Sequence, residues 1–183
     1  MKTIAYIFLI MIMCVGCMHK KQEVTNILPA NFAPLSDLNI TKKENIPQII
    51  TGRYKQKNMK AQGVLAVSKD SLNLIALTPI SRLFTLSYSK NNELKFQSEM
   101  SEFKKMKPEY ILFDLQLIYW SKTSLEKSFG ENYRIYDKGL SRDVFADNTH
   151  IAHIEYSGSD RLHSDIKFEN LRYGYSYKIE IQK

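Results

Sequence analysis

The side chains that could do chemistry in this sequence are few, and their spacing matches no known catalytic arrangement. The histidines are His19, His150, His153 and His163. Residues three positions apart in a strand point to opposite faces, so we expect His150 and His153 to be badly placed for joint metal binding. The sequence also lacks His-Glu-x-x-His and Gly-x-Ser-x-Gly motifs. We therefore expect no catalytic residue, no metal site, no cofactor and no enzymatic activity.

Cys17 is the residue with the clearest chemistry. Lys2 precedes an apolar run over residues 4–13, which has the form of a secretory signal and is too short to span a bilayer. The run ends at Cys14-Val15-Gly16-Cys17. This stretch resembles the lipobox of bacterial lipoproteins, except that Cys14 stands where leucine is usual. In lipoproteins the chain is cut after the small residue, and the next cysteine receives the lipid.

This resemblance implies that residues 1–16 are a lipoprotein signal peptide and that Cys17 is the lipidated N-terminus of the mature chain. Aspartate after the cysteine favours the inner membrane, and Met18 is not aspartate. We therefore expect the chain to be anchored by lipid in the outer membrane, at its periplasmic face. The alternatives are an uncleaved membrane anchor and a buried N-terminal helix.

The formal net charge of +7 is compatible with nucleic acid, an anionic membrane surface, or no charged partner at all. A lipid-anchored envelope protein would not meet nucleic acid, so we expect no nucleic-acid partner. Residues 17–50 contain Pro29, Pro34 and Pro47 and show no sustained apolar period. This pattern predicts a lipidated N-terminus and flexible tether, with at most a short helical turn within residues 31–40.

Residues 51–183 are expected to form a single α+β domain. Alternating apolar residues predict antiparallel strands on both sides of a central helical region. The expected strands cover residues 63–67, 71–77, 83–88, 94–97, 133–136, 142–145, 151–156, 166–171 and 173–181. Pro108, Glu109 and helical apolar spacing predict a helix up to Trp120, and a second helix is expected over residues 121–129.

The first of these helices is apolar almost all round, with Asp114 and Gln116 as its clearly polar residues. It must pack against apolar surface, either as a core helix or as a lid over a cavity. A lid would enclose inward-facing side chains that bind a ligand. Those residues would be Leu74, Ala76, Phe84, Leu86, Leu112 and Leu115. Tyr119 and Trp120 would suit a membrane interface at the rim, although for Trp120 the sequence favours burial in the core.

Four segments carry a resemblance to a known group. They are residues 52–54, 72–79, 82–88 and 113–120. These segments resemble domain of unknown function family 3261, a group of uncharacterised lipoproteins of Gram-negative bacteria, and the resemblance covers residues 52–183. The family is distantly similar to the lipoprotein receptor LolB and its carrier LolA. That similarity implies an antiparallel sheet curved into an unclosed half β-barrel, with helices covering the open mouth.

The expected function is that of a non-catalytic outer-membrane lipoprotein. It would bind or receive a lipid, acyl or lipidated ligand in an apolar cavity, for lipid trafficking in the envelope. Its partners would be the membrane, through the lipid anchor, a hydrophobic ligand, and a periplasmic carrier protein. The alternatives are a structural or assembly accessory that binds a protein through its sheet edge, and a hydrolase with a clustered nucleophile and base.

Overall fold

The computed structural model describes residues 28–54, 57–100 and 107–182. The expected signal peptide and Cys17 therefore lie outside the described residues. Within the described part of the chain, no helix combines the length and the hydropathy that crossing a membrane requires.

Ten strands form one antiparallel sheet in the order β5-β4-β3-β2-β1-β10-β9-β8-β7-β6. Their bounds are β1 Glu44–Tyr54, β2 Lys57–Val67, β3 Ser71–Leu77, β4 Arg82–Ser89, β5 Leu94–Gln97, β6 Tyr133–Lys138, β7 Ser141–Ala146, β8 Thr149–Tyr156, β9 Ile166–Asn170 and β10 Tyr175–Ile181. In the described structure β5 and β6 each have one neighbouring strand, so the sheet is not closed. The predicted α+β class with an antiparallel sheet is thus confirmed.

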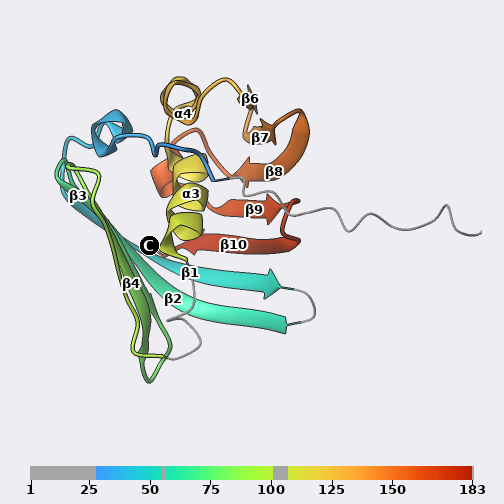
Figure 1. The fold of residues 1–183 in the computed structure, drawn as a ribbon. Helices are drawn as coiled ribbons and strands as arrows, with labels where there is room; N and C mark the ends of the chain where they lie inside the picture. The colour runs from blue at the N-terminus through green and yellow to red at the C-terminus, as the bar shows by residue number, and fades with distance from the viewer. Residues whose placement is uncertain (1–27, 55–56, 101–106, 183) are drawn as a thin grey trace, which may run out of the picture.

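Two helices connect β5 to β6 in the sequence. They are α3 (Pro108–Tyr119) and α4 (Lys122–Phe129). The sheet bends around α3, which crosses one face of the central strands (Figure 1). Pro108 occupies the first turn, where its missing N–H costs nothing, and the Ser121 side chain caps α4 by accepting a hydrogen bond from the Ser124 N–H. Two short 3₁₀ helices, η2 (Leu35–Leu38) and η3 (Arg161–His163), complete the elements.

The core lies between the inner face of the sheet and α3. Leu72, Leu74 and Ala76 are buried in β3, whereas the residues between them are partly exposed. Every residue of α3 from Leu112 to Tyr119 is buried. The helix is apolar all round because protein surrounds it on most sides.

The predicted tether over residues 17–50 is wrong for residues 28–50. Ala33 is fully buried, and its N–H donates to Gln116 Oε1 at 2.9 Å while its carbonyl accepts from Gln116 Nε2 at 2.7 Å. The expected domain boundary at residue 51 falls inside β1. Pro47 is tolerated in that strand because it lies where the β1–β10 ladder ends, and there its carbonyl accepts a hydrogen bond from the Gln182 N–H at 2.9 Å.

The position of Tyr119 at a membrane-facing rim is wrong, whereas the burial of Trp120 in the core, which the sequence favoured, is confirmed. Trp120 is completely buried, and its indole N–H donates to the carbonyl of Pro34 at 2.9 Å. Tyr119 is 6% exposed. Residues 28–40 cover this end of α3, so both aromatic side chains belong to the core.

Cationic side chains hold the carboxyl end of α3. Buried Arg142 donates to the carbonyls of Leu117 at 2.6 Å and Trp120 at 2.8 Å, and it binds both carboxylate oxygens of Asp137. Arg161 donates to the same Trp120 carbonyl at 3.1 Å and to Asp137 at 2.9 Å. Burial opposes ionisation of Asp137, but the arginines outweigh it and lower the pKa of this carboxyl. The positive charge complements the negative end of the helix dipole.

Candidate functional site

An apolar cavity of about 570 Å³ lies between α3 and strands β1, β2, β3, β4 and β10. Its walls come from the inner face of the sheet and from one side of the helix. The apolar side chains that line it include Ile50, Leu74, Leu83, Phe84, Ile111, Leu115 and Ile179. This volume lies within the range of ordinary small-ligand sites, which are mostly apolar with a few polar groups.

Small residues on the strands create the space. Gly52, Ala61 and Ala76 all line the cavity. Gly63 does not line the cavity, but a Cβ there would lie 2.9 Å from Cγ of the lining residue Gln48 on the neighbouring strand. Leucine or valine at Gly52, Ala61 and Ala76 would fill the space between the sheet and α3.

The structure places the six side chains expected to line a cavity in two groups. Leu74, Ala76, Phe84 and Leu115 line it. Leu86 and Leu112 are instead completely buried in the packed core and are not lining residues. Leu112 lies about 100° around α3 from Ile111 and about 60° from Leu115, at the edge of the helix face that lines the cavity.

Asp114 introduces a carboxyl group into this apolar site. It is 7% exposed, and its Oδ2 accepts hydrogen bonds from the hydroxyls of Tyr175 at 2.7 Å and Tyr177 at 3.4 Å. Its Oδ1 has no hydrogen-bond partner among the described residues, and neither has Oε1 of buried Gln48, another lining residue. Burial raises the pKa of Asp114 to about 7, although the two tyrosine hydrogen bonds oppose the shift.

Stacked rings set the positions of those tyrosine hydroxyls. Tyr177 packs on Phe168 of the adjacent strand with ring centroids 4.8 Å apart and an interplanar angle of 12°. Tyr175 stacks beside Tyr177, and its hydroxyl accepts a hydrogen bond from Asn170 at 3.0 Å. The rings therefore direct two O–H donors from β10 towards one oxygen of Asp114 on α3.

Exposed cations line the mouth of the cavity. Arg53, Lys60 and Lys107 are exposed lining residues, whereas Asp114 is the one acidic residue in the described lining and is buried. Exposed Met59 lies in the same lining. The site thus combines an apolar interior, the buried polar side chains of Asp114 and Gln48, and a positively charged entrance.

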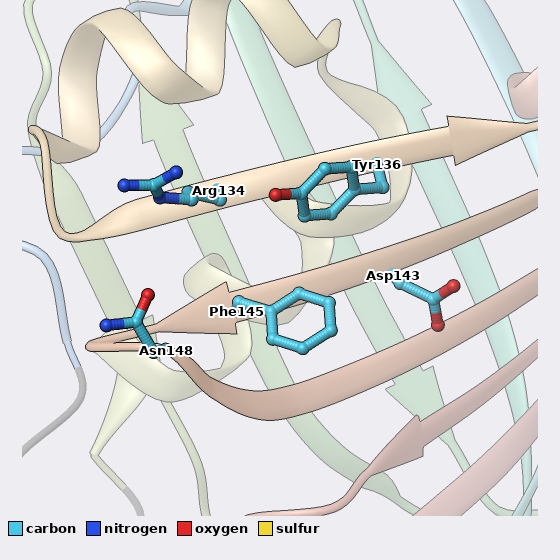
Figure 2. Close-up of a pocket in the computed structure, with 5 residues that line it drawn as sticks. All are labelled: Arg134, Tyr136, Asp143, Phe145 and Asn148. Atoms are coloured by element: carbon cyan, nitrogen blue, oxygen red, sulfur yellow. The ribbon is translucent and has the colours of Figure 1, made fainter.

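A shallow depression of about 460 Å³ occupies the outer face of the sheet. Arg134 and Tyr136 of β6 lie above Asp143 and Phe145 of β7, and Asn148 closes one end (Figure 2). It is separate from the internal cavity, because alternate residues of β7 are buried on the α3 side of the sheet.

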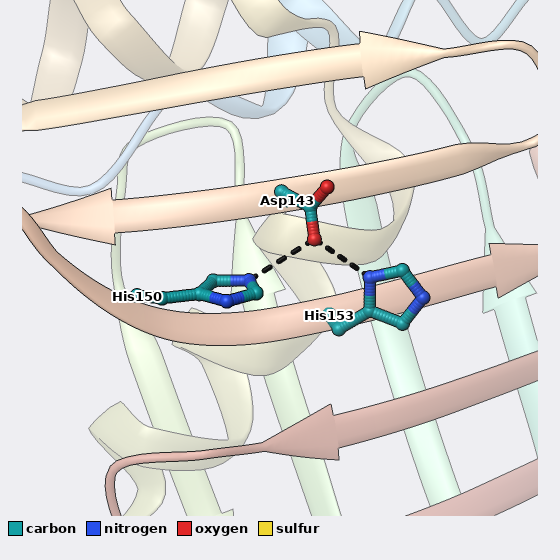
Figure 3. Close-up of side chains that lie close together, drawn as sticks. All are labelled: Asp143, His150 and His153. Carbon is teal, nitrogen blue, oxygen red and sulfur yellow. Dashed lines mark hydrogen bonds and ion pairs between the residues drawn. The ribbon is translucent and has the colours of Figure 1, made fainter.

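Three side chains that the sequence places apart converge beside this depression. Asp143 Oδ1 lies 3.0 Å from His150 Nε2 and 2.7 Å from His153 Nδ1 (Figure 3). The prediction that His150 and His153 lie on opposite faces is wrong. A β-bulge shifts the β7–β8 register, so Asp143 pairs with His153 and Phe145 pairs with His150. The extra residue in β8 returns both histidines to the outer face.

Neither the buried carboxyl group of Asp114 nor the cationic mouth was predicted as part of the candidate site. A carboxylate inside an otherwise apolar helix was the available signal for Asp114. Its partners, Tyr175 and Tyr177, are more than sixty residues away in the chain. No single segment of the sequence indicates the mouth, because its cations come from β1, from β2 and from the residue before α3.

These features define an α+β protein in which an unclosed antiparallel sheet and a central helix enclose an apolar cavity. The chain belongs to the family described as "Protein of unknown function (DUF3261)", whose sequence model matches residues 45–183. The match begins one residue after the start of β1 and so covers all of the sheet except Glu44. No curated protein sequence matches the chain.

Proposed function

We propose that this protein is a non-catalytic, lipid-anchored protein of the outer membrane that receives an acyl or lipidated ligand in the cavity beneath α3. The cavity is the observation that carries the proposal. In this reading the open sheet and α3 correspond to the unclosed half β-barrel and covering helix of LolB and LolA. The lipobox-like sequence ending at Cys17 supports the anchor and the envelope location.

The chemistry of the lining favours an amphiphile over a polar metabolite. Each methylene that leaves water for an apolar site contributes about 0.8 kcal/mol, so an alkyl chain needs no specific hydrogen bonds to bind. Arg53, Lys60 and Lys107 at the mouth complement an anionic headgroup. An alkyl chain under α3 would contact the apolar side chains of the lining, and its acidic end would lie beside the cations at the mouth.

Photocrosslinking in cells tests this proposal directly. Cells that produce the full-length chain are given a fatty acid bearing a diazirine and an alkyne, irradiated, and analysed by mass spectrometry of the peptides. We expect light-dependent lipid adducts on peptides from residues 57–77 and 107–115, which line the cavity. Adducts confined to the outer face of the sheet, or none on these peptides, would overturn the proposal. The permanent lipid at Cys17 lies on a different peptide and needs no light.

A pair of alanine substitutions supplies the matched control. Ala76→Phe places a ring in the cavity and is expected to abolish the adducts, because Ala76 is a buried lining residue. Ala66→Phe adds the same volume on β2, at a partly exposed position outside the lining. It should leave the adducts unchanged. Equal crosslinking of both variants would show that the ligand does not occupy the cavity.

The second candidate is an accessory protein that binds a protein partner through a sheet edge. The observation that favours it is the outer strand β6, which has one neighbour in the described sheet and carries Tyr136 at 50% exposure. Crosslinking from position 136 would identify such a partner. One dominant protein adduct, together with normal function of Ala76→Phe, would favour this role over ligand binding.

A further inference from the structure

We propose that Asp143, His150 and His153 bind a divalent transition-metal ion, such as Zn²⁺, on the outer face of the sheet. This inference is independent of the proposed ligand cavity. The potential ligand atoms all lie within 4.8 Å of one another, and the three side chains are partly buried. Three protein ligands with an open fourth position are typical of accessible zinc sites.

The spacing suits a metal after small side-chain movements. Ligand atoms about 2.1 Å from a tetrahedral ion are about 3.4 Å from each other. In the structure Asp143 Oδ1 lies 3.0 Å from His150 Nε2 and 2.7 Å from His153 Nδ1. Each side chain is about a third exposed, so the atoms can move apart by the remaining few tenths of an ångström without disturbing the core.

The backbone is built to keep both histidines together. Without the β-bulge, residues 150 and 153 would project from opposite faces of β8. Ile151 and Ala152 are consecutive buried residues, and they take up the extra position on the inner face. The two histidines therefore share one face only because of the β-bulge, which leaves one residue of β8 without a partner in β7.

Neighbouring side chains orient the two imidazoles. Phe145 stacks on His150 with ring centroids 4.7 Å apart and an interplanar angle of 15°. The other ring nitrogen of His153, Nε2, lies 3.8 Å from Glu155 Oε1. A carboxylate beside the second ring nitrogen is the usual way in which proteins fix the tautomer of a metal-binding histidine.

The donor set selects the kind of ion. Two imidazole nitrogens and one carboxylate oxygen suit Zn²⁺, Ni²⁺ or Cu²⁺ better than Ca²⁺ or Mg²⁺, which prefer shells made only of oxygen. His150 Nε2 also lies 3.0 Å from the carbonyl oxygen of Ala152, so an ion bound to this nitrogen would replace that contact. The depression that Asp143 also lines leaves room for water or a small ligand on the ion.

Calorimetric titration of the untagged, full-length chain in detergent, after removal of metal by a chelator, tests the site. We expect one Zn²⁺ to bind per chain and Mg²⁺ to give no binding. Asp143→Asn, His150→Ala and His153→Ala should each weaken Zn²⁺ binding by about tenfold or more. The absorption spectrum of bound Co²⁺ gives a second readout, and circular dichroism verifies that each variant is folded.

His163→Ala is the matched control. His163 also lies between carboxylates, at 2.8 Å from Asp160 and 2.9 Å from Glu44, but it uses a different ring nitrogen for each, so the three groups do not converge on one point. Its loss should leave Zn²⁺ binding unchanged. The proposal is refuted if the wild-type chain binds no Zn²⁺, or if binding survives in folded His150→Ala and His153→Ala variants.

Discussion

Gln116 and Ala33 form a reciprocal pair of hydrogen bonds, 2.9 and 2.7 Å long, although 83 residues separate them in the chain. The amide of Gln116 matches both main-chain groups of Ala33, as a neighbouring strand would. The carbonyl of Ala33 also accepts a hydrogen bond from the hydroxyl of Tyr88 at 3.0 Å. The segment before the sheet is thus fixed to α3 by buried polar contacts.

Gln116→Leu is expected to destabilise the fold. The substitution leaves the N–H of Ala33 buried without its partner, which costs about 1–3 kcal/mol in the free energy of unfolding. Urea denaturation followed by the fluorescence of Trp120, the single tryptophan, measures this change. Gln62→Leu, at an exposed position of β2, is the control and should change stability little. Equal stability of Gln116→Leu and the wild-type chain would contradict the prediction.

Arg142→Met should have a larger effect. It removes the guanidinium that binds the carboxylate of Asp137 and the carbonyls of Leu117 and Trp120. Breaking a buried ion pair by removing one partner costs about 3–5 kcal/mol. Thermal and urea unfolding should both show the loss, whereas Arg134→Met at an exposed site should not. A loss below about 1 kcal/mol would mean that Arg161 alone holds the helix end.

The pH dependence of stability should carry the signature of Asp114. Its pKa is raised by burial from 3.8 to about 7, so the folded state holds a proton that the unfolded state releases between these values. The contribution of this group is therefore most favourable at acidic pH and falls as pH rises towards 7, by at most about 1.4 kcal/mol per pH unit. Asp114→Asn should remove that slope between pH 4 and 7. If the unfolding free energies of wild-type and variant change in parallel, Asp114 titrates normally.

The charges at the cavity mouth should affect acidic ligands specifically. Lys107→Glu is expected to lower photocrosslinking of the diazirine fatty acid by roughly two- to fivefold, the range for an exposed charge pair. The neutral amide of the same fatty acid should be unaffected. Lys127→Glu changes the net charge equally but lies on α4, away from the lining, and serves as the control. An equal effect on both ligands would exclude a role in headgroup recognition.

Cys17→Ala is expected to give a folded protein that does not reach the membrane fraction. The thiol of Cys17 is the proposed lipid attachment site, and Cys14, the other cysteine of the sequence, precedes the proposed cleavage point. Cell fractionation and incorporation of a labelled fatty acid measure the outcome. Cys14→Ala should still be lipidated. Wild-type membrane location of the Cys17→Ala chain would refute the lipoprotein assignment.

The strands and α3 were predictable because their apolar periods are local. Alternation over residues 71–77 matches β3, and Pro108 with the apolar run after it marks α3. The start of the sheet was missed because Pro47 and scattered polar residues look like a linker. Only the tertiary structure shows that Pro47 lies where a ladder ends. The packing of Ala33 depends on Gln116, a contact without any local signal.

The sites were less accessible to sequence reasoning. A cavity depends on what is missing from several strands at once, and Gly52, Ala61 and Ala76 are unremarkable in their own segments. The histidine pair was misplaced because strand periodicity assumes regular pairing. One additional residue in β8 moves the side chains that precede it to the opposite face of the sheet. No residue type at that position predicts the bulge.

The attachments of α3 are unevenly distributed along its length. The described polar contacts from Asp114, Gln116 and the carbonyls of Leu117 and Trp120 belong to its second half. Tyr110, near the mouth, packs edge-on against Tyr173 and accepts a hydrogen bond from the Tyr173 hydroxyl at 3.4 Å. More of the described polar contacts therefore hold the carboxyl-terminal half of α3 than its amino-terminal half. If a ligand enters the proposed cavity, we expect it to displace the amino-terminal half of the helix first.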